Sequence, residues 1–296
     1  MPPFTGSGVF LITPFTEDGS AVNYDVLEQL IEFHLLHQTD ALFCFSPCGE
    51  VSSLSPEERT EYLSFITAKT KQRLPLFFDV SFADAARLSP LLRELEAAGI
   101  QGILAAPPGY QRLSQRCIAE YYRSLAELTS LPVIALNGPA FSPAVMTART
   151  LAEVIKAGSV AAFADGTRNF SLLTEVLSLV REDFPFYCAA SDVLLPALAL
   201  GACGGITLGA NLTPRSFHDL IQAAHGGQWS EARVLSLRLA PLYRLLASDA
   251  ALPLIKYGLQ CLNYRVGDCR PPLLAPEATG QEAVQRLLKG FGLLSD

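Results

Sequence analysis

Short apolar runs alternate with amphipathic stretches eight times along this chain, which restricts its possible folds more than any other feature. The runs are residues 8–15, 41–46, 75–81, 102–108, 132–138, 160–166, 184–191 and 204–210. Apolar runs of this length, each followed by a helical pattern, are typical of buried strands in βα units. Eight such units predict an α/β fold, a parallel sheet closed into a (β/α)8 TIM barrel.

The ends of the helical stretches carry their own signals. Residues 55–58 (SPEE) combine a capping serine, a first-turn proline and a glutamate at capping-box spacing. Gly99 and Gly158 stand where a left-handed residue would end a helix, and residues 213–214 (TP) open the eighth helical stretch. Several helix ends are therefore predicted as well as the helices themselves.

The pattern changes after the eighth unit. From about residue 229 it is helical only, interrupted by Pro271, Pro272 and Pro276. We therefore expect a barrel over residues 1–228 and a helical extension over residues 229–296 that packs on it.

Composition excludes several classes of function. The net charge of −7 comes from scattered acidic residues, and no basic run that would suit nucleic acid occurs. No apolar run reaches the roughly 18 to 20 residues of a membrane span, and residues 1–4 do not begin a signal peptide. Seven cysteines without a CxxC pair indicate reduced thiols. We expect a cytoplasmic protein that binds neither nucleic acid nor membrane.

Reacting groups of such barrels stand at the carboxyl ends of the strands, which gives a short set of candidates. They are Thr13, Ser46, Pro47, Cys48, Glu50, Asp79, Tyr110, Asn137, Asp165, Thr167, Arg168 and Thr207.

Several kinds of site are disfavoured. All four histidines fall in the first and eighth helical stretches, which argues against a histidine base or a histidine-rich metal site. The carboxylates are too dispersed to predict a metal site, and Asp192 is explained as a helix cap. Cys48 has no nearby histidine or lysine to lower its pKa, so we expect an inert thiol. No metal or cofactor is predicted.

Six segments carry a family resemblance. Residues 11–15 read LITPF, 46–50 SPCGE, 108–115 PGYQRLSQ, 136–139 LNGP, 205–211 GITLGAN and 253–256 PLIK. In this order they resemble the opening strand and the GTTGE, PYYNKPSQ, YNVPG, GVISVTAN and PIPVK segments of the dihydrodipicolinate synthase / N-acetylneuraminate lyase family. The resemblance implies a barrel that handles pyruvate or another 2-oxo acid, in a homodimer or homotetramer.

The same resemblance exposes four departures. The family's imine-forming lysine aligns with Ala164, its relay tyrosine with Leu136 and the partner threonine with Pro47. The basic residue that receives a substrate carboxylate in synthase members aligns with Phe141. Of the hydroxyl relay, only Tyr110 is kept by position.

No other lysine replaces the missing one in sequence. The chain has five, none at a strand end, and we expect none to reach the barrel axis: Lys69, Lys71, Lys156, Lys256 and Lys289. Enzymes lower barriers by roughly 8 to 23 kcal/mol, whereas a neutral hydrogen bond contributes about 1 kcal/mol. Polar groups alone would therefore not replace a covalent electron sink.

Three readings follow. The first is a repurposed or non-catalytic family member that binds a small carboxylate through loop N–H groups and Arg168. The second is a lyase or hydratase acting on a 2-oxo or hydroxy acid with Asp165, Tyr110 and Cys48, without an imine. The third is an aldolase whose lysine was removed by mutagenesis; the loss of the tyrosine, threonine and basic positions as well argues against it.

Overall fold

The computed structural model describes residues 1–83, 85–109 and 112–294. Within them, eight parallel strands close into a barrel in sequence order, with the eighth strand paired to the first. They are β1 (Gly6–Phe10), β2 (Ala41–Cys44), β3 (Leu76–Asp79), β4 (Gly102–Ala105), β5 (Val133–Asn137), β6 (Ala162–Asp165), β7 (Phe186–Cys188) and β8 (Gly204–Thr207). The predicted fold is confirmed; most strands are shorter than the apolar runs because the last residues of each run leave the sheet and form the loops at its carboxyl end.

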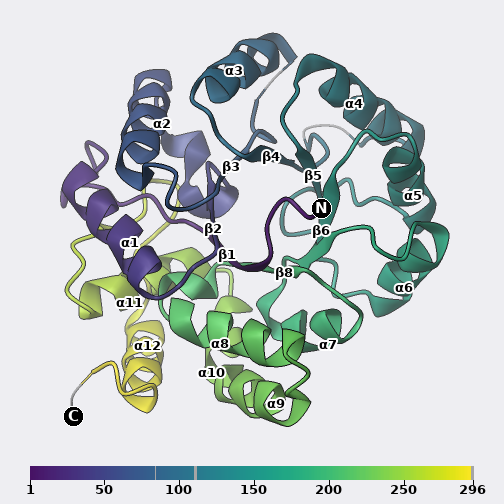
Figure 1. The fold of residues 1–296 in the computed structure, drawn as a ribbon. Coiled ribbons are helices and arrows are strands. Elements are labelled where there is room, and N and C mark those ends of the chain that lie inside the picture. Colours follow the sequence, from purple (N-terminus) through teal and green to yellow (C-terminus); the bar gives the residue numbers. More distant parts are fainter. Residues whose placement is uncertain (84, 110–111, 295–296) are drawn as a thin grey trace.

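Within the described residues, one α-helix follows each strand, and these eight α-helices form a ring around the barrel (Figure 1). They are α1 (Tyr24–Leu36), α2 (Pro56–Thr70), α3 (Ala85–Ala97), α4 (Gln115–Leu128), α5 (Ala148–Lys156), α6 (Phe170–Leu179), α7 (Leu194–Ala199) and α8 (Pro214–His225). The capping box between Ser55 and Glu58 is present at the start of α2. Gly99 and Gly158 have φ of +70° and +72°, as predicted for residues that end a helix.

Four further helices complete the described chain, beginning at the residue where the pattern changes. They are α9 (Trp229–Arg238), α10 (Ala240–Leu246), α11 (Ala251–Cys261) and α12 (Ala278–Gly290). In the described residues, no helix is both long and apolar enough to cross a membrane.

Aromatic side chains fill the inside of the barrel. Phe10, Phe43, Phe77 and Tyr187 belong to one buried cluster on the inner faces of the strands. Phe4 enters this cluster from the N-terminal segment and stacks on Tyr187, with ring centroids 4.3 Å apart. The chain start lies at the centre of the ring in Figure 1. The barrel interior is therefore a packed core, and space for a ligand is left only beyond its ends.

Candidate functional site

A cavity of about 550 Å³ lies at the carboxyl ends of the strands. We call it the mouth cavity. Loops after β2, β5, β6, β7 and β8 form its sides. The end of β1, the helices α10 and α11 and the segments after these two helices contribute the rest of its wall. Its lining residues are Phe10, Pro47, Cys48, Ala140, Phe141, Arg168, Ala189, Ala190, Ser191, Asp192, Leu208, Tyr243, Leu246, Ser248, Asp249, Ala251, Leu252 and Leu273. Its size and position are those of an active or binding site in this fold.

The side of the mouth cavity that faces the barrel is apolar. Phe141 and Phe10 lie with ring centroids 5.5 Å apart, and Phe141 packs against the inner barrel cluster. Leu136 on β5 and Ala164 on β6 are register neighbours in that cluster, and both are fully buried. The two positions that the family resemblance makes chemically important are thus occupied by hydrocarbon.

Asn137 holds the loop that carries Phe141. Its Oδ1 accepts the Met146 N–H at 2.8 Å, and its Nδ2 donates to the Met146 carbonyl at 3.3 Å. A side chain on Gly166 would come within 2.7 Å of the Phe141 ring, so a glycine there leaves room for the aromatic. Asn137 therefore fixes the position of this loop through hydrogen bonds to the loop backbone.

Arg168 brings positive charge to the rim of the mouth cavity. Its Nε donates to both carboxylate oxygens of Asp192, each at 2.8 Å. The backbone of Arg168 is left-handed, with φ of +57°. Its terminal nitrogens make no hydrogen bond within the described residues, so they can still meet a ligand. The prediction that Asp192 caps a helix is wrong: it pairs with Arg168, because β6 and β7 are adjacent strands and the loops that follow them lie close together.

Glu50 turns away from the mouth cavity and is buried in an ion pair. Its Oε1 lies 2.6 Å from the Lys256 Nζ, and its Oε2 accepts the backbone N–H of Arg270 at 2.8 Å. Arg270 also forms a bidentate pair with Glu58 at 2.7 Å. These contacts tie the C-terminal segments to the loop after β2, which supplies Pro47 and Cys48 to the cavity.

Asp79 is a buried carboxyl group on the inner face of the barrel. It is in register with Leu104, a member of the inner cluster. Its Oδ1 accepts hydrogen bonds from the backbone and the hydroxyl of Ser81, while its Oδ2 has no partner within the described residues. Burial raises the pKa of Asp79 to about 6, against the lowering effect of the Ser81 bonds. Asp79 is ionised at neutral pH, and burial of this charge costs folding free energy.

This cost gives a pH-dependent prediction. The folded pKa of Asp79 is raised, so the folded state binds the proton more tightly and stability falls as pH rises from about 4 to 6. Asp79→Asn removes that dependence. The unfolding free energy of the variant minus that of the wild type should rise by about 2 kcal/mol between pH 4 and pH 7. Urea unfolding of both proteins across this pH range measures the difference. Asp165 titrates in both proteins, so its contribution to the difference cancels.

Cys48 is the thiol among the predicted site residues. Burial, followed by the charge of Asp79, raises its pKa to about 12. A thiol with that pKa stays protonated at neutral pH and is a poor nucleophile. Ser46, two residues earlier, is also buried, and its hydroxyl has no partner within the described chain.

A model of the dihydrodipicolinate synthetase family matches residues 3–291. The chain belongs to this family. The resemblance drawn from the six sequence segments is therefore confirmed.

Relatives within the dihydrodipicolinate synthetase family match along their whole length. The 4-hydroxy-tetrahydrodipicolinate synthase of Acetivibrio thermocellus is 30% identical over 293 residues, which is 99% of each chain. The 4-hydroxy-tetrahydrodipicolinate synthase 1 of Clostridium acetobutylicum is 29% identical over 99% of this chain and 100% of its own. The solved dihydrodipicolinate synthase of Aquifex aeolicus superimposes with a TM-score of 0.93 at 27% identity, covering 98% of this chain and 99% of its own.

The remaining candidates of this family member do not gather at the mouth cavity. Asp165 follows the inward-facing Ala164 and lines a small separate cavity. Burial raises the pKa of Asp165 to about 6, and the Thr167 hydroxyl donates a hydrogen bond of 2.9 Å to its carboxylate. Thr13 is buried and donates to the Gly49 carbonyl at 2.6 Å, and Thr207 is buried with no partner within the described residues. Tyr110 lies outside the described residues.

Of the predicted site residues, the structure places Pro47, Cys48 and Arg168 at the mouth cavity. Sequence reasoning missed its far wall, which comes from α10 and α11 and from the segment after α11: Tyr243, Leu246, Leu252 and Leu273. A search restricted to strand ends could not find these residues. The one available signal was that the helical extension had to pack on some face of the barrel.

Within the described residues, the histidines and the other potential metal ligands do not form a metal site. His34 is fully buried, burial lowers its pKa to about 3, and its Nδ1 shares a hydrogen bond of 2.9 Å with the Thr39 hydroxyl. It is therefore a neutral packing residue at physiological pH. Across residues 1–83, 85–109 and 112–294, no group of three histidine, cysteine or acidic side chains is arranged to hold a metal ion.

Proposed function

We propose that this family member binds a small carboxylate with an apolar body in its mouth cavity and does not form an imine with it. The observation that carries the proposal is the lining of the cavity, which includes no lysine among the residues that the structure describes and is apolar where it meets the barrel. Leu136 and Ala164 are sealed in the barrel core behind that lining. An amine that could condense with a 2-oxo acid is therefore missing where the family chemistry would require one.

The polar part of the lining suits a carboxylate. Arg168 offers its terminal guanidinium nitrogens at the rim, where a planar fork of donors matches two carboxylate oxygens. Phe10, Phe141 and Leu252 offer apolar contact to the rest of the ligand. Asp192 neutralises part of the Arg168 charge and holds the side chain in place. We infer a ligand with one carboxylate and a compact apolar body.

Calorimetry with a set of short 2-oxo and 2-hydroxy acids tests this proposal. Arg168→Gln should weaken binding of the best ligand about tenfold, since it removes a charge-assisted contact. Arg181→Gln is the matched control, because Arg181 also pairs with an aspartate, Asp183, but does not line the cavity. The proposal would be contradicted if the two variants bound the ligand with equal affinity, or if no acid bound the wild type in a saturable way.

One observation favours the second reading, an imine-independent lyase or hydratase. Asp79 combines a pKa of about 6 with a buried oxygen that has no partner in the described chain, and such carboxyl groups are candidates for general acid or base catalysis. Within the described residues, Asp165 and Cys48 do not line one cavity. A turnover screen with the same acids separates the readings: turnover that Asp79→Asn abolishes supports the lyase, and binding without turnover supports the binder.

A further inference from the structure

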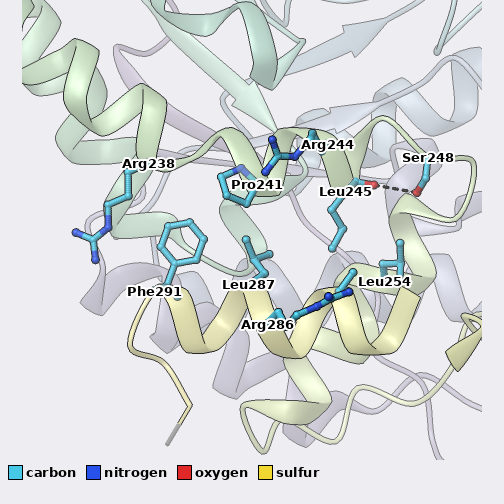
Figure 2. Close-up of a pocket in the computed structure, with 11 residues that line it drawn as sticks. Arg238, Pro241, Arg244, Leu245, Ser248, Leu254, Arg286, Leu287 and Phe291 are labelled. Atoms are coloured by element: carbon cyan, nitrogen blue, oxygen red, sulfur yellow. Dashed lines mark hydrogen bonds between the residues drawn. The ribbon is translucent and has the colours of Figure 1, made fainter. Parts of the chain in front are cut away.

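A second cavity, of about 570 Å³, lies in the C-terminal helices. We call it the arginine groove. Two helical faces form its walls with matching spacing (Figure 2). The α10 face consists of Pro241, Arg244, Leu245 and, just beyond the helix, Ser248; the α12 face consists of Ala283, Arg286, Leu287 and Gly290. Residues three, four and seven apart share one side of a helix, so each set points into the same space.

The floor of the arginine groove is apolar and open. Leu245 and Leu287 face each other across it in Figure 2, with Phe291 at one end and Leu254 at the other. Small residues keep the space free: a side chain added to Gly290 would meet no atom within 4 Å. The volume falls within the roughly 300 to 1,000 Å³ typical of small-molecule sites.

Three arginines surround this apolar floor: Arg238, Arg244 and Arg286. None of them makes a hydrogen bond or an ion pair within the described chain, and the Arg238 guanidinium lies over the Phe291 ring, 5.9 Å from its centroid. Among the described residues, no acidic side chain lines the groove. In a chain with a net charge of −7, this is a local concentration of unpaired positive charge around hydrocarbon.

We propose that the arginine groove binds an anionic amphiphile, a small molecule with a carboxylate or phosphate head and an aliphatic body. The head would take hydrogen bonds from the guanidinium groups, which match both kinds of oxyanion. The body would cover the partly exposed Phe291 and the edges of the buried Leu245 and Leu287 that reach the groove, where apolar contact is favoured. This site is separate from the mouth cavity, although Ser248 lines both.

Calorimetry with decanoate and decyl phosphate, below the concentrations at which they form micelles, tests the proposal. The wild type should bind at least one of the two in a saturable way, and decanol and acetate should bind much more weakly. Whichever anion binds more tightly identifies the preferred head group. Equal binding of neutral decanol, or no saturable binding of either anion, would overturn the proposal.

Variants locate the site. The triple change Arg238→Gln, Arg244→Gln and Arg286→Gln should weaken binding about tenfold, since it removes every guanidinium group that could donate to the anionic head. Ala283→Phe, which fills the groove, should abolish binding. A control with the same change in charge alters exposed arginines elsewhere and should bind as the wild type does: Arg116→Gln, Arg149→Gln and Arg233→Gln.

The mouth cavity must be excluded as the place of binding. Arg168→Gln should leave the affinity for decanoate unchanged, so failure of this proposal is distinguishable from failure of the proposed function. Loss of decanoate binding in Arg168→Gln, or equal losses in the two triple variants, would contradict a site in the arginine groove.

Discussion

Lys256→Met is expected to lower the free energy of unfolding by about 3 to 5 kcal/mol. Lys256 is 1% exposed, and its Nζ lies 2.6 Å from Glu50, donates to the Asp268 carbonyl at 3.2 Å and sits 4.2 Å from the centroid of the Phe15 ring. Removal of the ammonium group leaves the Glu50 carboxylate buried without its cation. Urea unfolding followed by circular dichroism measures the loss.

The matched control removes both charges. Lys256→Met combined with Glu50→Gln leaves no buried ion, so it should lose much less stability than the single change. The single variant should also bind carboxylates more weakly, because Glu50 closes the loop that brings Pro47 and Cys48 to the mouth cavity. If both variants unfold at the same urea concentration as the wild type, the buried pair does not stabilise this loop.

Ala164→Lys is expected to destabilise the barrel by about 4 kcal/mol or more at pH 7 and to leave aldol cleavage absent. The Ala164 side chain is fully buried beside Leu136 and Tyr187, where an ammonium group has no carboxylate neighbour on the inner face of its strand. Burial lowers the pKa of such a lysine by up to 3 to 5 units, at about 1.4 kcal/mol per unit.

The pH dependence of stability and an uncharged control variant show whether the buried charge causes the loss of stability in Ala164→Lys. The unfolded state of Ala164→Lys holds its proton up to a pKa near 10.4, and the folded state loses it earlier, so stability should rise with pH between 7 and 10. Ala164→Met has a similar length without charge and should show no such rise. Recovery of full aldol cleavage by Ala164→Lys would instead support an aldolase that had lost its lysine by mutagenesis.

Local sequence signals predicted the parts of the fold that depend on neighbours along the chain. The capping box of Ser55 and Glu58 and the ends of helices at Gly99 and Gly158 each involve a few consecutive residues. The eight strands followed from apolar runs because a strand that is covered on both faces must be apolar throughout. Closure of the barrel then placed the strand ends at one face.

The site itself depends on contacts that local patterns do not encode. Arg168 meets Asp192 only because β6 and β7 are adjacent, and Glu50 meets Lys256 only because α11 packs against the loop after β2. Asp165 was a candidate by its place at a strand end, yet alternation turns it away from the inner face on which Ala164 lies. Position at a strand end was thus neither sufficient nor necessary for a place in the mouth cavity.

Borohydride trapping tests most directly whether an imine can form in the mouth cavity. The protein is mixed with pyruvate and reduced with sodium borohydride, and the intact protein and its peptides are then analysed by mass spectrometry. A family member that carries the strand-six lysine serves as the positive control. We expect no pyruvyl adduct on any residue that lines the cavity or on Lys256. An adduct mapped to one of these residues would show that a reactive amine reaches the ligand, and it would contradict the proposed function.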